Sequence, residues 1–193
     1  MMAIRSLSYQ DHTDEELLPL IAGGSTPAFD ELYHRYGQKM FSYFFRMLWK
    51  NKELAEDQTQ ELFLKIIYHA KSFEAGRSFS TWFYSIAHNM CKNEYRKEES
   101  RMKYAKIKTG ESIAGNEKNL DLRRFKEAVS NCISKLNEEK KSLFILRFQE
   151  HMSIPEISTI LDIPEGTIKS RLFYLLKDMK EDLNEFKTLH IYP

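Results

Sequence analysis

The sequence predicts an all-α fold, and two observations support that prediction. Glycine and proline are scarce, with 7 and 5 among 193 residues, and no strongly alternating β-branched segment is present. Apolar residues recur instead at spacings of three and four along most of the chain, the periodicity of amphipathic helices. At this length we expect two small helical domains, in residues 1–97 and 121–193, joined by a flexible linker at 98–120.

The charge, the apolar runs and the cysteines of the chain limit the functions that it can have. The net charge of +1 says little about partners, because nucleic-acid binding depends on where charge sits rather than on its sum. The N-terminus has no apolar run of signal-peptide length and no segment approaches a membrane span, so we expect a cytoplasmic protein. Cys91 and Cys132 fall within apolar helical patterns and are expected to be buried free thiols.

Nothing in the sequence indicates catalysis. The six histidines are scattered without metal-ligand spacing, and neither a Gly-rich phosphate loop nor a nucleophile elbow is present. We therefore expect no enzyme activity, metal, cofactor or small-molecule substrate.

Two helices are expected at the start of the chain. Residues 13–16 (Thr-Asp-Glu-Glu) have the form of a capping box ahead of an apolar run. Gly23–Gly24 should end this short helix, and Pro19 should kink it or shift its start. Thr26–Pro27 then supplies a cap and a first-position proline for an aromatic-rich helix reaching Leu48.

The third expected helix, from about Lys52 to Ser72, has more apolar residues than one stripe needs. Its core positions would be Leu54, Leu62, Ile66, Ile67, Ala70 and Phe73. Asp57, Gln60, Glu61 and Lys65 are left for the outside. Phe63 and Leu64 extend the apolar set, so some apolar surface is expected at a partner-binding site. The alternative is that Phe63 packs inside.

The fourth helix, from about Ser80 to Lys97, combines a core stripe with a polar face. The stripe is Phe83, Ile86, Ala87, Met90 and Cys91, and the polar face is Ser85, His88, Asn89, Lys92, Asn93 and Arg96. Trp82 and Tyr84 lie at its start. Aromatic rings interleaved with amides and cations suit single-stranded nucleic acid, whose bases stack on rings. A solvated face with the aromatics buried explains the same pattern.

The C-terminal domain is expected to contain four helices, beginning at Leu120–Asp121, with Asn137 as a helix cap. Its last two helices, within Ser153–Lys177, are short and separated by a break at 162–164, which is the outline of a helix-turn-helix. The second would bury Ile168, Leu172, Leu175, Leu176 and Met179 and expose Thr167, Lys169, Ser170, Arg171, Phe173 and Tyr174. A plain helical hairpin in an all-α core remains the alternative on this stretch.

Four blocks together resemble bacterial RNA polymerase sigma factors of the extracytoplasmic-function subfamily of the sigma-70 family. They are AFDELYHRYG at 28–37, AEDQTQELFLKI at 55–66, FSTWFYSIAHNMCKNEYRK at 79–97 and SIPEISTILDIPEGTIKSRLF at 153–173. Each is moderately specific, but all four stand in the family's order and spacing. The resemblance covers the chain from Asp14 to about Leu183, apart from the linker.

The resemblance implies a dissociable specificity subunit that directs promoter-specific transcription initiation. It implies docking on the β′ clamp helices of core RNA polymerase through Asp57, Gln60, Glu61 and Phe63. Capture of the promoter −10 element would fall to Trp82, Tyr84, Asn89, Lys92, Asn93 and Arg96. The −35 element would be contacted by Thr167, Lys169, Ser170, Arg171, Phe173 and Tyr174. It also implies an anti-sigma factor as inhibitor, often membrane-bound in the family.

The sequence departs from the family pattern near Arg171. The family commonly continues with one or two arginines, whereas this chain has an apolar and aromatic run at 172–176. Fewer cations mean fewer phosphate contacts and a weaker salt dependence of DNA binding. The isolated second domain should therefore bind DNA weakly. Two other interpretations remain: a helix-turn-helix regulator that binds duplex DNA without polymerase, and a helical adaptor with no DNA role.

Overall fold

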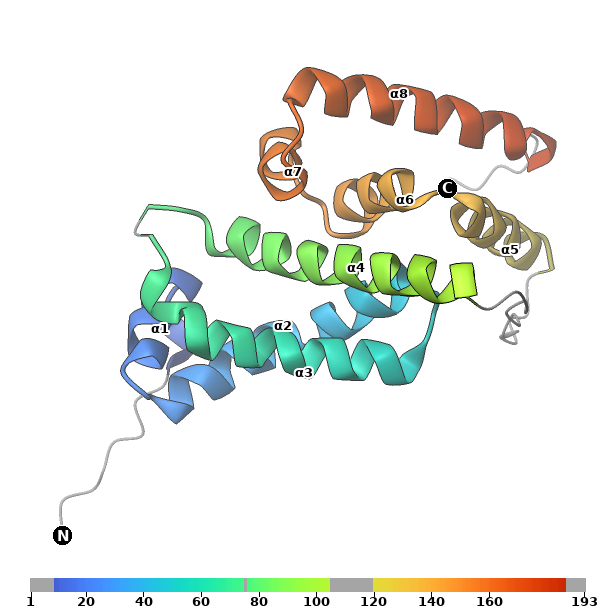
Figure 1. Cartoon of the computed structure of the whole chain (residues 1–193). Coiled ribbons are helices and arrows are strands. Elements are labelled where there is room, and N and C mark those ends of the chain that lie inside the picture. Colours follow the sequence, from blue (N-terminus) through green and yellow to red (C-terminus); the bar gives the residue numbers. More distant parts are fainter. Residues whose placement is uncertain (1–8, 75, 105–119, 187–193) are drawn as a thin grey trace, which may run out of the picture. The chain divides into compact units, whose positions relative to one another are not determined.

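The structure, a computed structural model, describes residues 9–74, 76–104 and 120–186 (Figure 1). All regular elements among these residues are helices, which confirms the predicted fold class. The chain divides into two compact units, residues 1–94 and 95–193. None of the helices in the described ranges is long and apolar enough to cross a membrane.

The first unit is built from α1 (Asp14–Ala22), α2 (Thr26–Met47), α3 (Lys52–His69) and most of α4 (Phe79–Tyr104). The capping box predicted at residues 13–16 is present, and Gly23 caps the C-terminus of α1. Pro19 lies inside α1 and does not shift its start. Ser25, not Thr26, caps α2, because its side chain accepts the Ala28 N–H. A short 3₁₀ turn at Ala70–Ser72 leads from α3 towards α4.

Aromatic rings dominate the core of the first unit. The Phe79 and Phe83 rings stack with centroids 5.0 Å apart, and Tyr36 packs edge-on against both at 5.3 Å. Tyr43 packs edge-on against Tyr84. Each buried aromatic side chain contributes on the order of 1.5–3 kcal/mol, so this core is strong for a unit of its size.

A polar network ties the N-terminal segment to α2. The Arg35 guanidinium donates to the Asp14 carboxylate at 2.8 Å and to the backbone carbonyls of Tyr9, Gln10 and His12. The Tyr36 hydroxyl donates to the same carboxylate. Burial, reinforced by the Asp14 charge, raises the pKa of Tyr36, so this hydroxyl stays a donor at neutral pH.

The second unit has an aliphatic core and includes two short helices, of 7 and 8 residues. Its elements are α5 (Leu120–Lys135), α6 (Glu138–Phe144), a π-helical turn (Ile145–Gln149), α7 (Ile154–Leu161) and α8 (Glu165–Asp182). Asn137 caps α6, as predicted. The buried positions are mainly Leu143, Ile145, Leu146, Ile157, Ile160, Ile168, Leu172 and Leu175.

Two turns of the second unit use a left-handed backbone at residues other than glycine. His151, before α7, has φ 57°, and Asp162, which caps the C-terminus of α7, has φ 55°. The Ser158 hydroxyl donates to the Ile163 carbonyl at 2.6 Å and closes the turn between α7 and α8. This turn gives α7 and α8 the predicted helix-turn-helix connection, with α8 starting at Glu165.

The start of the predicted linker differs from the structure. The α4 helix continues to Tyr104, so residues 98–104 are helical rather than linker. The remainder of the predicted linker, residues 105–119, lies outside the described residues. Cys91 and Cys132 are buried free thiols, as predicted. The described residues contain no cluster of His, Cys, Asp and Glu that could hold a metal ion.

Candidate polymerase and promoter interfaces

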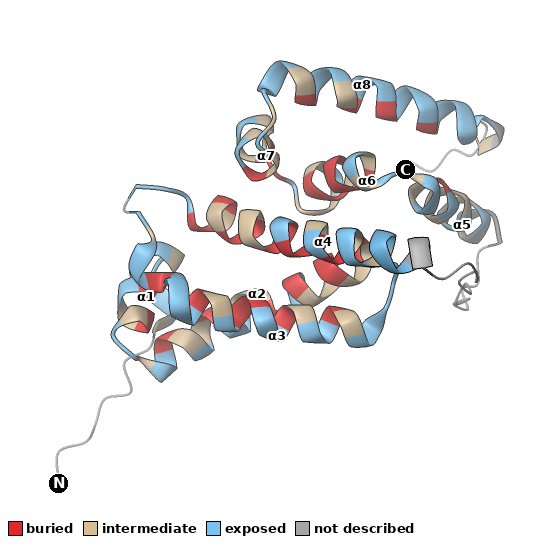
Figure 2. Ribbon diagram, in the orientation of Figure 1, coloured by how far each residue is buried: buried red, intermediate tan, exposed pale blue. Residues whose placement is uncertain are grey.

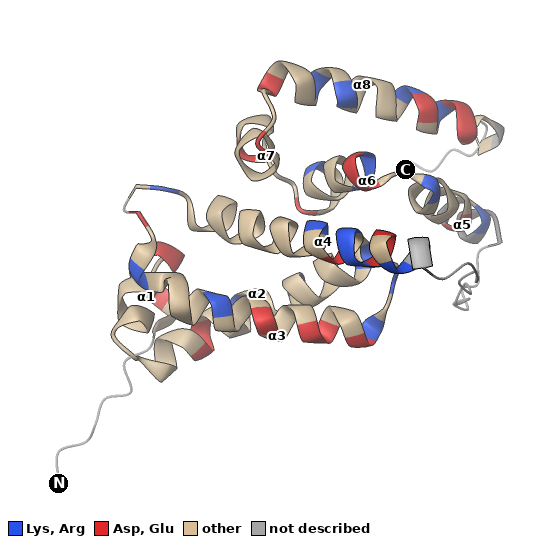
Figure 3. Ribbon diagram, in the orientation of Figure 1, with Lys and Arg blue, Asp and Glu red and all other residues tan. Residues whose placement is uncertain are grey.

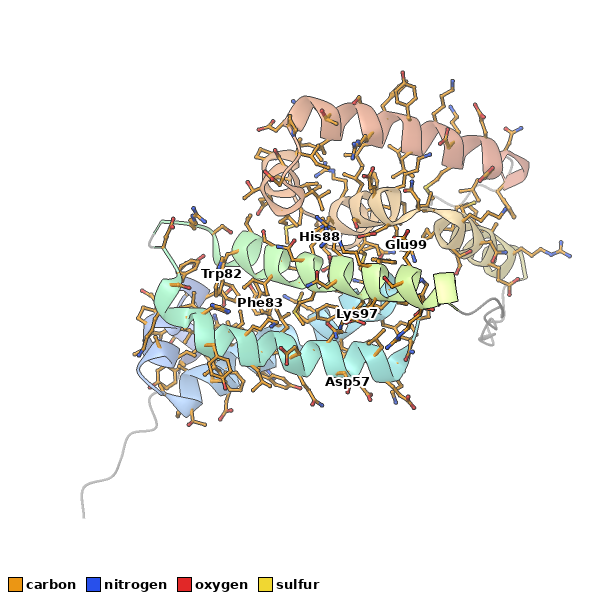
Figure 4. The ribbon with its side chains drawn as sticks, in the orientation of Figure 1. Asp57, Trp82, Phe83, His88, Lys97 and Glu99 are labelled. Atoms are coloured by element: carbon orange, nitrogen blue, oxygen red, sulfur yellow. The ribbon has the colours of Figure 1, made fainter. Side chains whose placement is uncertain are left out.

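One side of α3 combines acidic and polar groups with apolar ones. Asp57, Gln60 and Glu61 are exposed, as predicted, and Figure 4 labels Asp57 on α3. Leu64 and Tyr68 follow at helical spacing and are exposed as well, Tyr68 to 78%. We call these five residues the α3 outer stripe. It is acidic and polar at its N-terminal end and apolar at its C-terminal end, which is the composition of a surface that binds another protein.

Phe63 does not belong to that stripe, and the expectation that its ring forms part of an exposed docking surface is wrong. Its side chain is only 2% exposed. The ring packs 4.7 Å from Tyr33 and 5.7 Å from Phe83, between α2 and α4. The reason is helical geometry, because position 63 lies one turn from the buried Thr59 and Ile66 on the same side of the helix.

Sequence reasoning missed the contribution of Tyr68 and placed Ile67 in the core. Both are exposed, and together with Leu64 they leave three large apolar side chains on the C-terminal half of α3. The available signal was the surplus of apolar residues beyond one stripe. The surplus predicted exposed apolar surface and pointed correctly to Leu64, but it also pointed to the buried Phe63 and not to Tyr68.

The α4 helix changes character at its middle (Figure 3). Residues 79–91 carry no acidic residue, lysine or arginine and include four aromatic rings, whereas residues 92–101 include Lys92, Arg96, Lys97 and Arg101. Trp82, Asn89, Asn93 and Arg96 recur at spacings of seven, four and three, so they share one side of the helix. We call them the α4 outer face. Lys92 lies at its edge, half-buried.

Buried residues follow another side of α4, and they include a predicted promoter contact (Figure 2). Tyr84 is only 3% exposed, with its ring 5.4 Å from that of Tyr43. The expectation that Tyr84 captures a base is therefore wrong, since its ring is used in the core. His88, which the pattern assigned to the polar face, is also buried.

Trp82 sits at an aromatic corner that leaves it half-exposed. Its ring lies 5.2 Å from Phe73, in the segment between α3 and α4, and 6.1 Å from Phe79. Contacts with two other rings hold the indole at the surface. A flat, partly exposed aromatic ring of this kind can stack on an unpaired base.

On α8 the six predicted residues divide into an outer group and a flanking pair. Lys169, Ser170, Phe173 and Tyr174 lie on the side opposite the buried Ile168, Leu172 and Leu175. Phe173 and Tyr174 are 65% and 60% exposed, with their rings packed edge-to-face at 5.4 Å. Leu176, expected in the core, is also exposed, because it lies at the edge of the buried stripe.

The flanking pair is Thr167 and Arg171, both half-buried. The Arg171 guanidinium lies 3.1 Å from the Glu139 carboxylate of α6, and Lys140 of α6 lies 2.7 Å from Asp178 of α8. Arg171 therefore helps to brace α8 against α6. Over its whole length α8 carries four cationic residues and four carboxylates (Figure 3), so its attraction to DNA phosphates is weak.

The chain matches two family models, one for each unit. Residues 32–101 match Sigma-70 region 2, and residues 126–179 match Sigma-70 region 4. The first match covers the α3 outer stripe and the α4 outer face. The second covers the helix-turn-helix.

Individual relatives and solved structures agree with the two family matches. The chain is 27% identical over 175 residues to the ECF RNA polymerase sigma factor SigW of Bacillus subtilis, covering 84% of this chain and 92% of the relative. It is 30% identical over 177 residues to the ECF RNA polymerase sigma-E factor of Haemophilus influenzae, covering 83% and 90%.

Two solved structures share the fold at a TM-score of 0.66 each. One is CnrH in complex with the cytosolic domain of CnrY, at 19% identity, covering 89% of this chain and 97% of that one. The other is the sigma factor RpoE in complex with the anti-sigma factor NepR from Bartonella quintana, at 21% identity, covering 81% and 96%. The order of the two regions and the extent of the matches lead to one conclusion: the chain belongs to the extracytoplasmic-function sigma factors of the sigma-70 family.

Proposed function

We propose that three surfaces divide the work of a sigma factor in this chain, which binds core RNA polymerase and directs initiation at its promoters. The α3 outer stripe docks on the β′ clamp helices, the α4 outer face captures the −10 element and α8 contacts the −35 element. Residues 1–97 hold the first two surfaces and residues 121–193 the third. The observation that carries the proposal is the presence of all three surfaces, exposed, on a chain that matches both sigma-70 regions.

Docking would depend on the apolar end of the α3 outer stripe as much as on its acidic end. Protein interfaces draw most of their affinity from a few buried apolar and aromatic anchors, while exposed rim charges contribute orientation and association rate. Within the α3 outer stripe, Leu64 and Tyr68 fit the first role, and the exposed Ile67 lies beside them. Asp57, Gln60 and Glu61 fit the second.

The change of character along α4 suits a junction between single-stranded and duplex DNA. The uncharged first half offers Trp82 as a stacking platform and Asn89 as a hydrogen-bonding group towards unpaired bases, and Asn93 adds a second amide just beyond it. The second half offers Lys92 and Arg96 to phosphates. Extruding bases costs a few kcal/mol, which stacking and hydrogen bonding on this face would offset.

At the −35 element, α8 offers few cations but two exposed rings. Lys169 and Ser170 can donate to base edges and phosphates, and Phe173 can make apolar contact with a thymine methyl group. With four carboxylates offsetting four cations, α8 needs the rest of the holoenzyme to hold it on DNA. The chain acts without catalysing a reaction of its own, and it acts in the cytoplasm.

The test is transcription with purified core polymerase and the full chain on a library of genomic fragments. We expect new transcripts whose upstream sequences share a −10 and a −35 element. Absence of any chain-dependent start site would refute the sigma function. A gel-shift assay with and without core polymerase separates the alternative, because a stand-alone regulator would bind duplex DNA tightly without polymerase.

We also propose regulation by an anti-sigma factor that covers these surfaces. The support is twofold: exposed apolar residues on α3 and α8 call for a cover in the resting state, and one solved structure of the same fold contains such a partner. Co-expression of the chain with a candidate partner should abolish chain-dependent transcription. Continued transcription despite a stable complex would contradict the proposal.

A further inference from the structure

A carboxylate from α1 caps the helix that carries the α4 outer face. The Glu15 Oε1 atom accepts the backbone N–H of Phe79 at 2.8 Å, across 64 residues of sequence. Phe79 is the first residue of α4. Glu15 lies before residue 32, where the region 2 match begins.

The first turn of any helix leaves backbone N–H groups without partners inside the helix. In α4 the Thr81 N–H is accepted by the Ser78 hydroxyl at 3.4 Å, a long bond, and the Phe79 N–H is accepted by Glu15. A carboxylate at this end also interacts favourably with the positive end of the helix dipole. Glu15 therefore acts as an N-cap supplied by another helix.

The capped turn sets the position of Trp82. Phe79 is fully buried, stacks on Phe83 and lies 6.1 Å from Trp82, whose other neighbour is Phe73. The α1 helix also packs against the Ala70–Ser72 turn, just before Phe73. Both ring contacts of Trp82 thus depend on segments that α1 holds in place.

We propose that Glu15 is a positioning residue for −10 capture, holding the first turn of α4 so that the Trp82 ring is presented to an unpaired base. The inference rests on the proposed role of Trp82. Without the cap, the first turn of α4 frays, and the indole no longer has one fixed orientation.

The experiment uses full-length chains in a Trp49→Phe background, which leaves Trp82 as the single tryptophan. Glu15→Ala removes the cap, whereas Glu15→Gln keeps an acceptor oxygen. Glu16→Ala is the matched control: it removes the neighbouring carboxylate, which accepts the Thr13 N–H at 2.7 Å within α1, and does not touch α4. Tryptophan emission and acrylamide quenching report the surroundings of Trp82. Holoenzyme affinity for a promoter with a mismatched, pre-opened −10 region reports capture.

Loss of an N-cap corresponds to about a fivefold change in an equilibrium constant. We expect Glu15→Ala to weaken binding to the pre-opened promoter by about that factor and to raise quenching of Trp82. Glu15→Gln and Glu16→Ala should stay close to the parent in both assays. If Glu15→Ala fails to fold, Glu15→Asp, which keeps the charge but shortens the reach, replaces it and should show the same two changes in weaker form.

Three results would overturn the inference in distinguishable ways. Parent-like emission and affinity in Glu15→Ala, with affinity lost in Trp82→Ala, would remove the positioning role and leave the −10 role of Trp82 intact. Parent-like affinity in Trp82→Ala would remove the −10 role itself, and the inference with it. Equal losses in Glu15→Ala and Glu16→Ala would show a general effect of α1 stability and no specific cap.

Discussion

Each unit is proposed to present one helix to DNA, and the structure gives the two helices different amounts of support. Helix α4 rests on a core of interlocking rings from α2 and α3, both of which are long helices. Helix α8 rests on α6 and α7, which have only 7 and 8 residues. Its core is aliphatic, and ion pairs at the α6 contact supplement the packing.

The difference fits the two tasks proposed for these helices. Capturing unpaired bases requires rings held in fixed positions, because a mobile ring would lose its stacking energy to entropy. Contact with duplex DNA needs a helix of the right shape, and its affinity can come from being tethered to a second site on the same DNA. A strong platform for α4 and a modest one for α8 are therefore sufficient together.

The largest expected effect distinguishes a buried residue of the first unit from an exposed one. Phe63→Ala should lower the free energy of unfolding by about 3–5 kcal/mol, since it empties a ring-lined site. Its neighbour Leu64 is half-exposed, so Leu64→Ala should leave stability nearly unchanged and weaken binding to core polymerase. Chemical denaturation and a polymerase pull-down measure the two. Equal stability of both variants would contradict the burial of Phe63.

The next effect tests whether Arg171 contacts DNA or only braces α8. Arg171→Ala should weaken holoenzyme binding to a −35-containing duplex by about 1–3 kcal/mol, the usual value of one specific contact. Assembly with core polymerase should not change. Glu139→Gln breaks the ion pair at 3.1 Å but keeps the arginine, so its DNA affinity should equal or exceed the parent value. Equal losses in both variants would assign Arg171 to bracing alone.

A smaller effect concerns the ability of α8 to bind DNA without the rest of the holoenzyme. Tyr174 is exposed on the outer side of α8, and Tyr174→Arg adds a cation at that point. We expect the salt dependence of DNA binding by the full chain to steepen by about 0.9 in log–log slope, the value for one phosphate contact. Fluorescence anisotropy between low and moderate salt measures the slope. Tyr174→Phe is the control and should leave it unchanged.

The smallest effect concerns the stability of the second unit, in which α8 has less supporting structure than α4 has in the first. His151 is exposed with φ 57°, a conformation that costs residues other than glycine roughly 1–2 kcal/mol. Replacing His151 by glycine removes this cost, but glycine also adds conformational entropy to the unfolded chain, which offsets part of the gain. His151→Gly should therefore stabilise the second unit by less than about 1 kcal/mol. Asp162→Gly should gain less, since aspartate tolerates this region. Denaturation midpoints compare the two, and a loss of stability in His151→Gly would contradict strain at this turn.

The fold could be predicted from the sequence because its signals are local. The capping box at 13–16, the Asn137 cap and the break at 162–164 all depend on residues a few positions apart. The extension of α4 to Tyr104 was missed, because that segment has many charges and no apolar stripe. A helix that needs no buried face gives no periodic signal.

Burial at the site was harder to predict than the helices themselves. Phe63 and Tyr84 are aromatic residues at helical spacing, and whether each faces inward depends on where α2 places Tyr33 and Tyr43. The Glu15 cap joins residues 64 apart and leaves no mark in either segment. Trp82, Asn89, Asn93 and Arg96 share one side of α4 because they lie on a single uninterrupted helix.

Because α4 is continuous, it also fixes the distance between the groups at its two ends. Its 26 residues, at 1.5 Å each, span about 39 Å, close to one turn of duplex DNA. The distance from the aromatic corner at Trp82 to the cations of the second half is thus fixed by residue number. One residue inserted at its middle would rotate the second half by about 100° relative to the first. If α4 captures the −10 element as proposed, covalent geometry sets the phase between the point of strand opening and the adjoining duplex.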